Sequence, residues 1–162
     1  DCVGYIIVGA PYQDAQQSVD DLLYLFRRRV LAGVSVFYPA PGSADFGLCR
    51  GMNLLPGNES LYRSSALPLD HTSSRLDTVT LLRLGRIANF IMRLEDQGGV
   101  RPEPEPCGQI RLTPSTDRFE TGRLLLQWFL FDGKIRGIDA DGRIYEHMAS
   151  TNLTMRFIKK LV

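Results

Sequence analysis

Two short apolar runs on either side of an amphipathic helix constrain the fold of this chain more than any other feature. The first run, residues 3–8 (VGYIIV), has no polar alternation, as expected of a strand that is covered on both faces. A Gly-Ala-Pro turn at 9–11 ends this run, and Asp14 can cap the helix that follows. Residues 34–38 (VSVFY) form the second run. Residues 3–38 therefore predict a strand–helix–strand unit with parallel strands, the repeating piece of an α/β barrel or parallel sheet.

The position of this unit in the chain indicates that neighbouring strands are missing. In parallel α/β folds the functional residues gather where the strands end, here at residues 8–11 and 38–43. Parallel sheets are normally buried and need more than two strands, and this chain opens almost directly on the first of its two. We therefore expect the chain to be the carboxyl-terminal part of a longer protein, with an exposed apolar edge where the missing strands belong.

Composition and charge exclude several classes of protein. The formal net charge of +1 gives no electrostatic basis for binding nucleic acid or an acidic membrane surface. No apolar run approaches the roughly 20 residues that span a bilayer. Three widely spaced cysteines, Cys2, Cys49 and Cys107, argue against a disulfide framework and favour a reducing compartment. We therefore expect a cytoplasmic protein.

The rest of the chain divides at a stretch rich in proline and glycine. Before it, apolar residues at helical spacing predict a long helix over 76–94. Thr72, Ser73 and Ser74 are its candidate caps, and Asp77 stands three residues beyond Ser74, as in a capping box. Residues 96–110 combine glycine, proline and charge, a composition typical of a linker. We therefore expect three parts, which are a first domain over 1–95, a linker over 96–110 and a small α+β accessory domain over 111–162.

The segment after the linker predicts a helix, a hairpin and a second helix. Residues 119–131 and 152–161 carry apolar residues at helical spacing, and the hairpin between them turns at Asp141 and Gly142. A unit of this size rarely sustains a hydrophobic core of its own. We therefore expect it to pack against the preceding domain as a buttress.

Two of these motifs, in this order and spacing, resemble a known family. Residues 4–11 (GYIIVGAP) and the capped helix after them resemble the fifth strand and following turn of radical S-adenosylmethionine enzymes, which often read D-I-I-V-G-x-P-G-E-T there. Residues 34–43 (VSVFYPAPGS) resemble the sixth strand, whose end often reads Y-x-P-x-P-G-T. Residues 63–90 and 120–147 resemble the carboxyl-terminal part of the bacterial subgroup that often carries an N-terminal cobalamin-binding domain.

The resemblance implies an α/β fold that is the last strand–helix–strand unit of a partial (β/α)6 barrel, followed by a small α+β helix–hairpin–helix extension. The parent enzyme would cleave S-adenosylmethionine with a 4Fe–4S cluster and so start radical chemistry on an unidentified, small-molecule or other, substrate. Cobalamin is a further cofactor that the subgroup implies for the parent. By resemblance, the residues that would line the adenine side of S-adenosylmethionine and close its pocket are Ile6, Ile7, Val8, Gly9, Phe37, Tyr38 and Pro39.

The chain also departs from the family pattern. The Cys-x-x-x-Cys-x-x-Cys loop that holds the cluster is missing, and Cys2, Cys49 and Cys107 do not have its spacing. Tyr12 and Gln13 stand in the turn where the family often has glycine and glutamate. We therefore expect no catalytic residue or metal ligand in this chain, and no activity or cofactor binding by the chain alone. The expected partner is the missing N-terminal half of the barrel.

Two alternatives stay open. The first is a small non-catalytic α/β protein that acts in binding or assembly. The second concerns His71, which follows Asp70 and lies among serines, but no Gly-x-Ser-x-Gly motif accompanies it as in a hydrolase. A loop histidine beside a helix cap is the simpler interpretation. If the barrel exists in the parent, His71 and Arg63 could instead reach its mouth.

Overall fold

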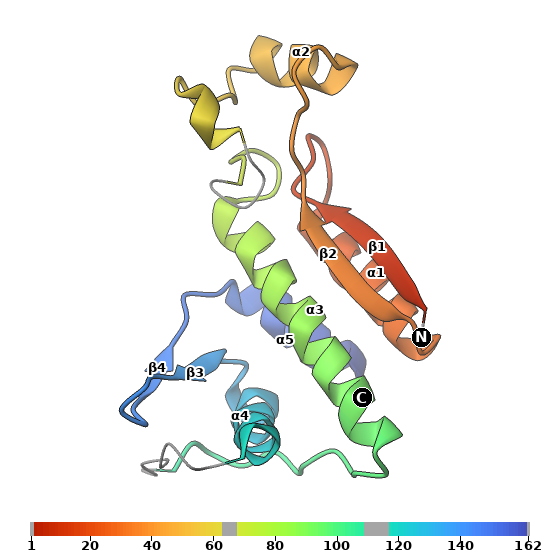
Figure 1. Ribbon diagram of the computed structural model, residues 1–162, viewed down its shortest axis with the longest axis vertical. Helices are drawn as coiled ribbons and strands as arrows, with labels where there is room; N and C mark the ends of the chain where they lie inside the picture. The colour runs from red at the N-terminus through yellow and green to blue at the C-terminus, as the bar shows by residue number, and fades with distance from the viewer. Residues whose placement is uncertain (1, 63–67, 109–116, 162) are drawn as a thin grey trace.

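Two parallel strands joined by a helix form the first part of the structure, a computed structural model that describes residues 2–62, 68–108 and 117–161 (Figure 1). The chain is α/β, and its sheets have two strands each. The elements in chain order are β1 (Val3–Val8), α1 (Ala15–Arg27), β2 (Leu31–Val36), α2 (Ala44–Gly51), the short 3-10 helix η1 (Glu59–Leu61), α3 (Arg75–Asp96), α4 (Arg118–Asp132), β3 (Arg136–Ile138), β4 (Ile144–Glu146) and α5 (Thr151–Leu161).

The predicted parallel pairing of the first two strands is confirmed. β1 and β2 are parallel, and their register runs from Val3 opposite Leu31 to Val8 opposite Val36. β2 begins three residues earlier than the apolar run predicts, since the backbone N–H of Leu31 already donates to the Cys2 carbonyl at 3.0 Å. Pairing with β1, which local composition does not reveal, therefore sets the bounds of this strand.

The sheet has one covered face and one open face. Alternate residues of β1 point to opposite faces, so that Val8 is fully buried whereas Val3, Tyr5 and Ile7 are 46%, 79% and 57% exposed. In Figure 1, α1 lies behind both strands, and nothing in the described part of the chain covers the face turned towards the viewer. The expectation that both faces of the first strand are covered is therefore wrong here, because the chain supplies helices to one side only. We call the exposed side, with Val3, Tyr5 and Ile7, the open face.

The two edges of this sheet also differ. Beyond β2, the side chain of Asn89 on α3 accepts from the backbone N–H of Ala32 at 2.8 Å and donates to its carbonyl at 2.9 Å. This side chain therefore occupies the outward-facing backbone groups of Ala32, one of the residues with which a further strand would pair. Beyond β1, no other strand pairs with the sheet within the described residues.

Helix α3 is the longest element and packs against both β2 and α1. It starts at the predicted capping box, in which the hydroxyl of Ser74 accepts from the Asp77 backbone N–H at 3.0 Å. Gly85 lies where α3 comes closest to the sheet, and a Cβ atom there would stand 2.5 Å from a methyl carbon of Val34. The missing side chain therefore lets the helix and strand approach closely.

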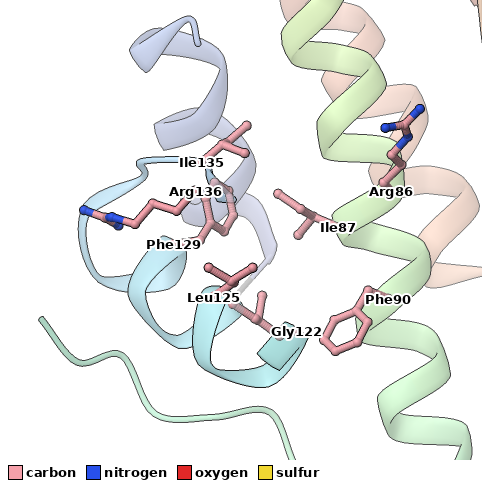
Figure 2. Close-up of a pocket in the computed structure, with 9 residues that line it drawn as sticks. Arg86, Ile87, Phe90, Gly122, Leu125, Phe129, Ile135 and Arg136 are labelled. Atoms are coloured by element: carbon pink, nitrogen blue, oxygen red, sulfur yellow. The ribbon is translucent and has the colours of Figure 1, made fainter. Parts of the chain in front are cut away.

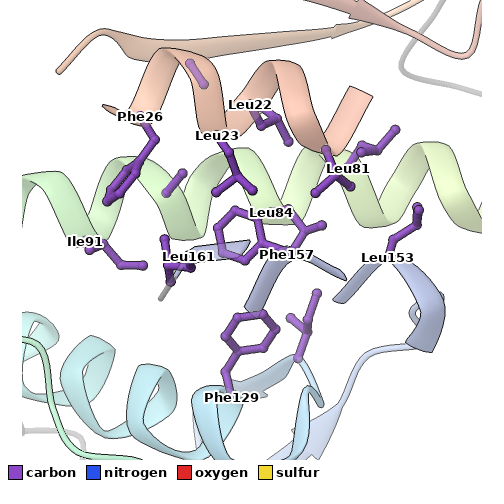
Figure 3. Close-up of a cluster of buried hydrophobic side chains, with 14 of the residues drawn as sticks. Leu22, Leu23, Phe26, Leu81, Leu84, Ile91, Phe129, Leu153, Phe157 and Leu161 are labelled. Atoms are coloured by element: carbon purple, nitrogen blue, oxygen red, sulfur yellow. The ribbon is translucent and has the colours of Figure 1, made fainter. Parts of the chain in front are cut away.

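The hydrophobic core draws on both ends of the chain. Phe157 of α5 is fully buried and lies between α1 and α4, with its ring centroid 6.2 Å from that of Phe129 (Figure 3). Leu23 of α1, Leu84 of α3 and Leu161 of α5 belong to the same cluster. The segment after the linker thus packs against the preceding residues, in the way the buttress interpretation predicts.

The start of the predicted linker is held in place. Arg101 donates to the Glu95 carboxylate at 2.7 Å and to the Leu161 carbonyl at 3.2 Å. Its guanidinium carbon also lies 5.3 Å from the centre of the Phe26 ring. One arginine of the linker therefore contacts α1, α3 and α5.

Substitution of Gly85 tests the close contact between α3 and β2. We expect Gly85→Ala to lower the free energy of unfolding by about 1 kcal/mol, since overpacking costs ~1–3 kcal/mol and the gain in helix propensity offsets ~1 kcal/mol. In a Val34→Ala background the same change should be neutral or stabilising, because the opposing methyl group is gone. Urea unfolding of the four variants measures both effects, and equal losses in the two backgrounds would contradict the contact.

Candidate functional site

The carboxyl ends of β1 and β2 meet at an unusual turn, residues 9–13, which we call the strand-end turn. The backbone N–H of Phe37 donates to the Val8 carbonyl at 2.8 Å, so the two strands stay paired up to this point. Within the turn, Gly9 and Tyr12 have φ angles of 81° and 65°, both in the left-handed region. The Gln13 side chain closes the turn by donating to the Ile7 carbonyl at 2.8 Å.

A segment from far along the chain lies against this turn. The ring of His71 places Nε2 2.9 Å from the Gly9 carbonyl oxygen. Because a carbonyl oxygen only accepts, Nε2 carries the proton that is donated in this hydrogen bond. Two residues later, the buried hydroxyl of Ser73 donates to the Gln13 carbonyl at 2.7 Å. The residues leading into α3 are therefore bonded to both ends of the strand-end turn.

The residues expected to line a cofactor pocket do not all face the same way. Val8 and Ile6 lie on the covered side, where Val8 belongs to the core and Ile6 packs against it. Ile7 lies on the open face. The second group follows β2 directly, with Phe37 half-buried, Tyr38 exposed and Pro39 buried. The structure thus brings the two groups together at one end of the sheet, with Ile7 alone among the β1 side chains of this set facing outward.

Gly9 is required by the packing of α3. A Cβ atom at this position would stand 2.8 Å from the hydroxyl oxygen of Thr78, a fully buried residue in the first turns of that helix. The positive φ angle adds a second reason for glycine. Close approach of a ligand is therefore not needed to explain the residue.

The cysteines do not form a ligand set. Cys2 and Cys107 are exposed, and Cys49 is buried in α2. Burial, together with the charge of Asp45, raises the pKa of the Cys49 thiol, which disfavours the thiolate that binds iron. Among the described residues, no group of three or more histidine, cysteine or carboxylate side chains could hold a metal ion.

A cavity lies between α3 and α4, away from the strand ends. Its volume is about 180 Å³, and its mainly apolar walls include Phe90, Leu125 and Phe129 (Figure 2). Arg136 stands at its edge with 5% of its side chain exposed and pairs with Asp132 at 2.5 Å. Burial opposes ionisation of Asp132, but hydrogen bonds from Arg136 and the Lys134 backbone outweigh it and hold the pKa of this carboxyl below its usual value. The positive charge of Arg136 is thus already paired with the carboxylate of Asp132.

Comparison with known proteins adds no relative. No family model matches the chain, and no significant match to a curated protein or a solved structure was found. Within the described residues, no helix combines the length and apolar character needed to cross a membrane.

Sequence reasoning pointed to only part of this site. His71 was weighed as a residue near a barrel mouth and does lie at the strand ends, whereas Arg63 falls outside the described residues. Gln13 stands in the turn that the sequence predicts, but Ser73 was not expected there. A signal exists for Ser73, because α3 starts just after it and a helix returning along β2 must begin near the end of that strand.

The conformation of Tyr12 gives a direct test of strain in the strand-end turn. A left-handed conformation costs an L-residue ~1–2 kcal/mol, and glycine avoids this cost. Glycine in turn lowers the free energy of unfolding by ~0.5–1 kcal/mol, because it has more conformational freedom to lose when the chain folds. Since Tyr12 is 70% exposed, we expect Tyr12→Gly to raise the free energy of unfolding by about 0.5–1 kcal/mol. Thermal and urea unfolding measure the change.

Asn53 provides the matched control, because it also has a positive φ angle, of 55°, and asparagine tolerates this conformation. Asn53→Gly should therefore give a smaller gain. A loss of stability in Tyr12→Gly would mean that the tyrosine ring holds the turn by packing.

Proposed function

We propose that this chain is the carboxyl-terminal part of a cytoplasmic radical S-adenosylmethionine enzyme, to which it contributes the last strand–helix–strand unit of a partial barrel. The observation that carries this proposal is the asymmetry of the first sheet. One face is covered by helices, and the opposite face exposes Val3, Tyr5 and Ile7. Among the described residues no strand pairs beyond β1, whereas Asn89 of α3 occupies part of the edge beyond β2. In a barrel, the open face would line the interior and β2 would be the last strand.

The proposal assigns the chemistry to the missing part of the protein. The cysteines of this chain do not fit a 4Fe–4S cluster, so the cluster ligands are expected in the N-terminal half of the barrel, as is any cobalamin-binding domain. The chain would contribute the wall of the S-adenosylmethionine site at the ends of β1 and β2. On this proposal the chain alone turns nothing over.

The decisive experiment uses the full-length parent protein. We expect the gene upstream of Asp1 to encode a Cys-x-x-x-Cys-x-x-Cys loop. The purified protein, reconstituted anaerobically with iron and sulfide and reduced with dithionite, should convert S-adenosylmethionine to 5′-deoxyadenosine, which chromatography detects. The control is a variant in which the three cysteines of that upstream loop are replaced. An upstream sequence without the cysteine triplet, or a reconstituted protein that forms no 5′-deoxyadenosine, contradicts the proposal.

The open face gives a second test, on the chain by itself. Tyr5→Thr combined with Ile7→Thr should reduce self-association and the binding of a hydrophobic dye, because both side chains are exposed in this chain. The thermal midpoint of this double variant should change by only a few degrees. The control Val8→Thr, on the covered face, should lower the free energy of unfolding by ~1–3 kcal/mol. In the full-length protein the same double variant should be destabilising.

A second candidate is a small non-catalytic α/β protein that acts in binding or assembly. The hydrophobic core favours it, because both ends of the chain contribute to that core. Residues of α1, α3, α4 and α5 form one hydrophobic cluster, the kind of shared core that an independent protein requires. In this case the open face would dock on a partner. A double variant with Tyr5→Thr and Ile7→Thr that stays as stable as the wild type in the full-length protein would favour this candidate.

A further inference from the structure

The strand-end turn is held from outside at both ends. Its first residue, Gly9, accepts a hydrogen bond from His71, and its last, Gln13, accepts one from Ser73. The donors stand two residues apart in the segment that leads into α3. Any shift of this segment therefore moves both ends of the turn together.

The turn needs such support. Tyr12 and Gly9 both occupy the left-handed region, and a non-glycine residue stays there only when its surroundings hold it. Inside the turn, the backbone N–H of Ala10 donates to the Gln13 side chain at 3.1 Å. The bonds from His71 and Ser73 tie this local arrangement to the body of the protein.

Stability alone does not explain a histidine at this position. The Nδ1 atom of His71 is enclosed and has no hydrogen-bond partner among the described residues. A buried polar atom without a partner lowers the stability of the fold. The other ring nitrogen, Nε2, makes the hydrogen bond that reaches the turn at the strand ends.

We propose that His71, assisted by Ser73, is a positioning residue that holds the strand-end turn in place for S-adenosylmethionine. This inference rests on the proposed function, and His71 acts through the turn without touching the ligand. His71 is bonded to the Gly9 carbonyl, and the Gln13 side chain donates to the Ile7 carbonyl. The hydrogen bonds around the turn thus extend from His71 to Ile7. The turn and the outward-facing Ile7 are thereby fixed relative to each other.

The test measures the affinity of the reconstituted full-length protein for S-adenosylmethionine by calorimetry. His71→Ala should weaken binding about fivefold, the change expected when one neutral hydrogen bond no longer holds the turn. His71→Gln should restore most of the affinity, because its side-chain amide has a donor at a similar reach. Ser73→Ala provides a second, smaller perturbation and is expected to weaken binding about twofold to fivefold.

Asn89→Ala is the matched control. It removes two hydrogen bonds between α3 and the sheet, at the opposite end of β2 from the turn. We expect it to lower the thermal midpoint but to leave the affinity within about twofold of wild type. If His71→Ala binds as tightly as wild type, or if Asn89→Ala weakens binding as much as His71→Ala, the positioning role is overturned.

The same measurement separates this inference from the proposed function. A wild-type protein that does not bind S-adenosylmethionine contradicts the function itself, and the positioning role with it. A wild-type protein that binds it, together with an unaffected His71→Ala variant, contradicts only the positioning role.

Discussion

The packing of α3 along β2 is the contact on which the rest of the structure depends. The helix touches the β1–α1–β2 unit at Thr78 beside Gly9, at Gly85 beside Val34 and at Asn89 beside Ala32. These contacts run from the carboxyl ends of the strands back to the start of β2, so helix and strand are antiparallel. Once this alignment is set, the residues that precede α3 must lie at the strand ends.

The chain combines a side that is covered by packed helices with a sheet face that is exposed. On the covered side, α5 lies against α1, and Asp20 of α1 pairs with Arg156 and Lys160 of α5, each at 2.7 Å. Hydrogen bonds from these two cations hold the pKa of the Asp20 carboxyl below its usual value. Exposed pairs of this kind stabilise little, so the apolar contacts of Phe157 and Leu161 dominate. Within the described residues the open face has no such cover, so that Val3, Tyr5 and Ile7 stay exposed.

Local patterns in the sequence predict the elements well, because each depends on nearby residues. The capping box at Ser74 and the turn at Gly142 were both expected from residue types, and the structure places each at an element boundary or turn. Contacts between distant residues were harder to predict. Nothing in the composition indicates that Asn89 binds Ala32 or that His71 binds Gly9, because both depend on how α3 aligns with the sheet.

The features that cost stability gather at the strand ends, where the sequence motifs also point. Among non-glycine residues with positive φ, Arg29 follows the end of α1, and Asn53 is of a type that tolerates this conformation. Tyr12 has neither explanation, and it lies in the turn that the unsatisfied ring of His71 contacts. Proteins tend to keep local departures from ideal structure where function requires them. Two independent costs at one turn therefore support the proposal that the strand ends, rather than the apolar cavity beside α4, form the functional region of this chain.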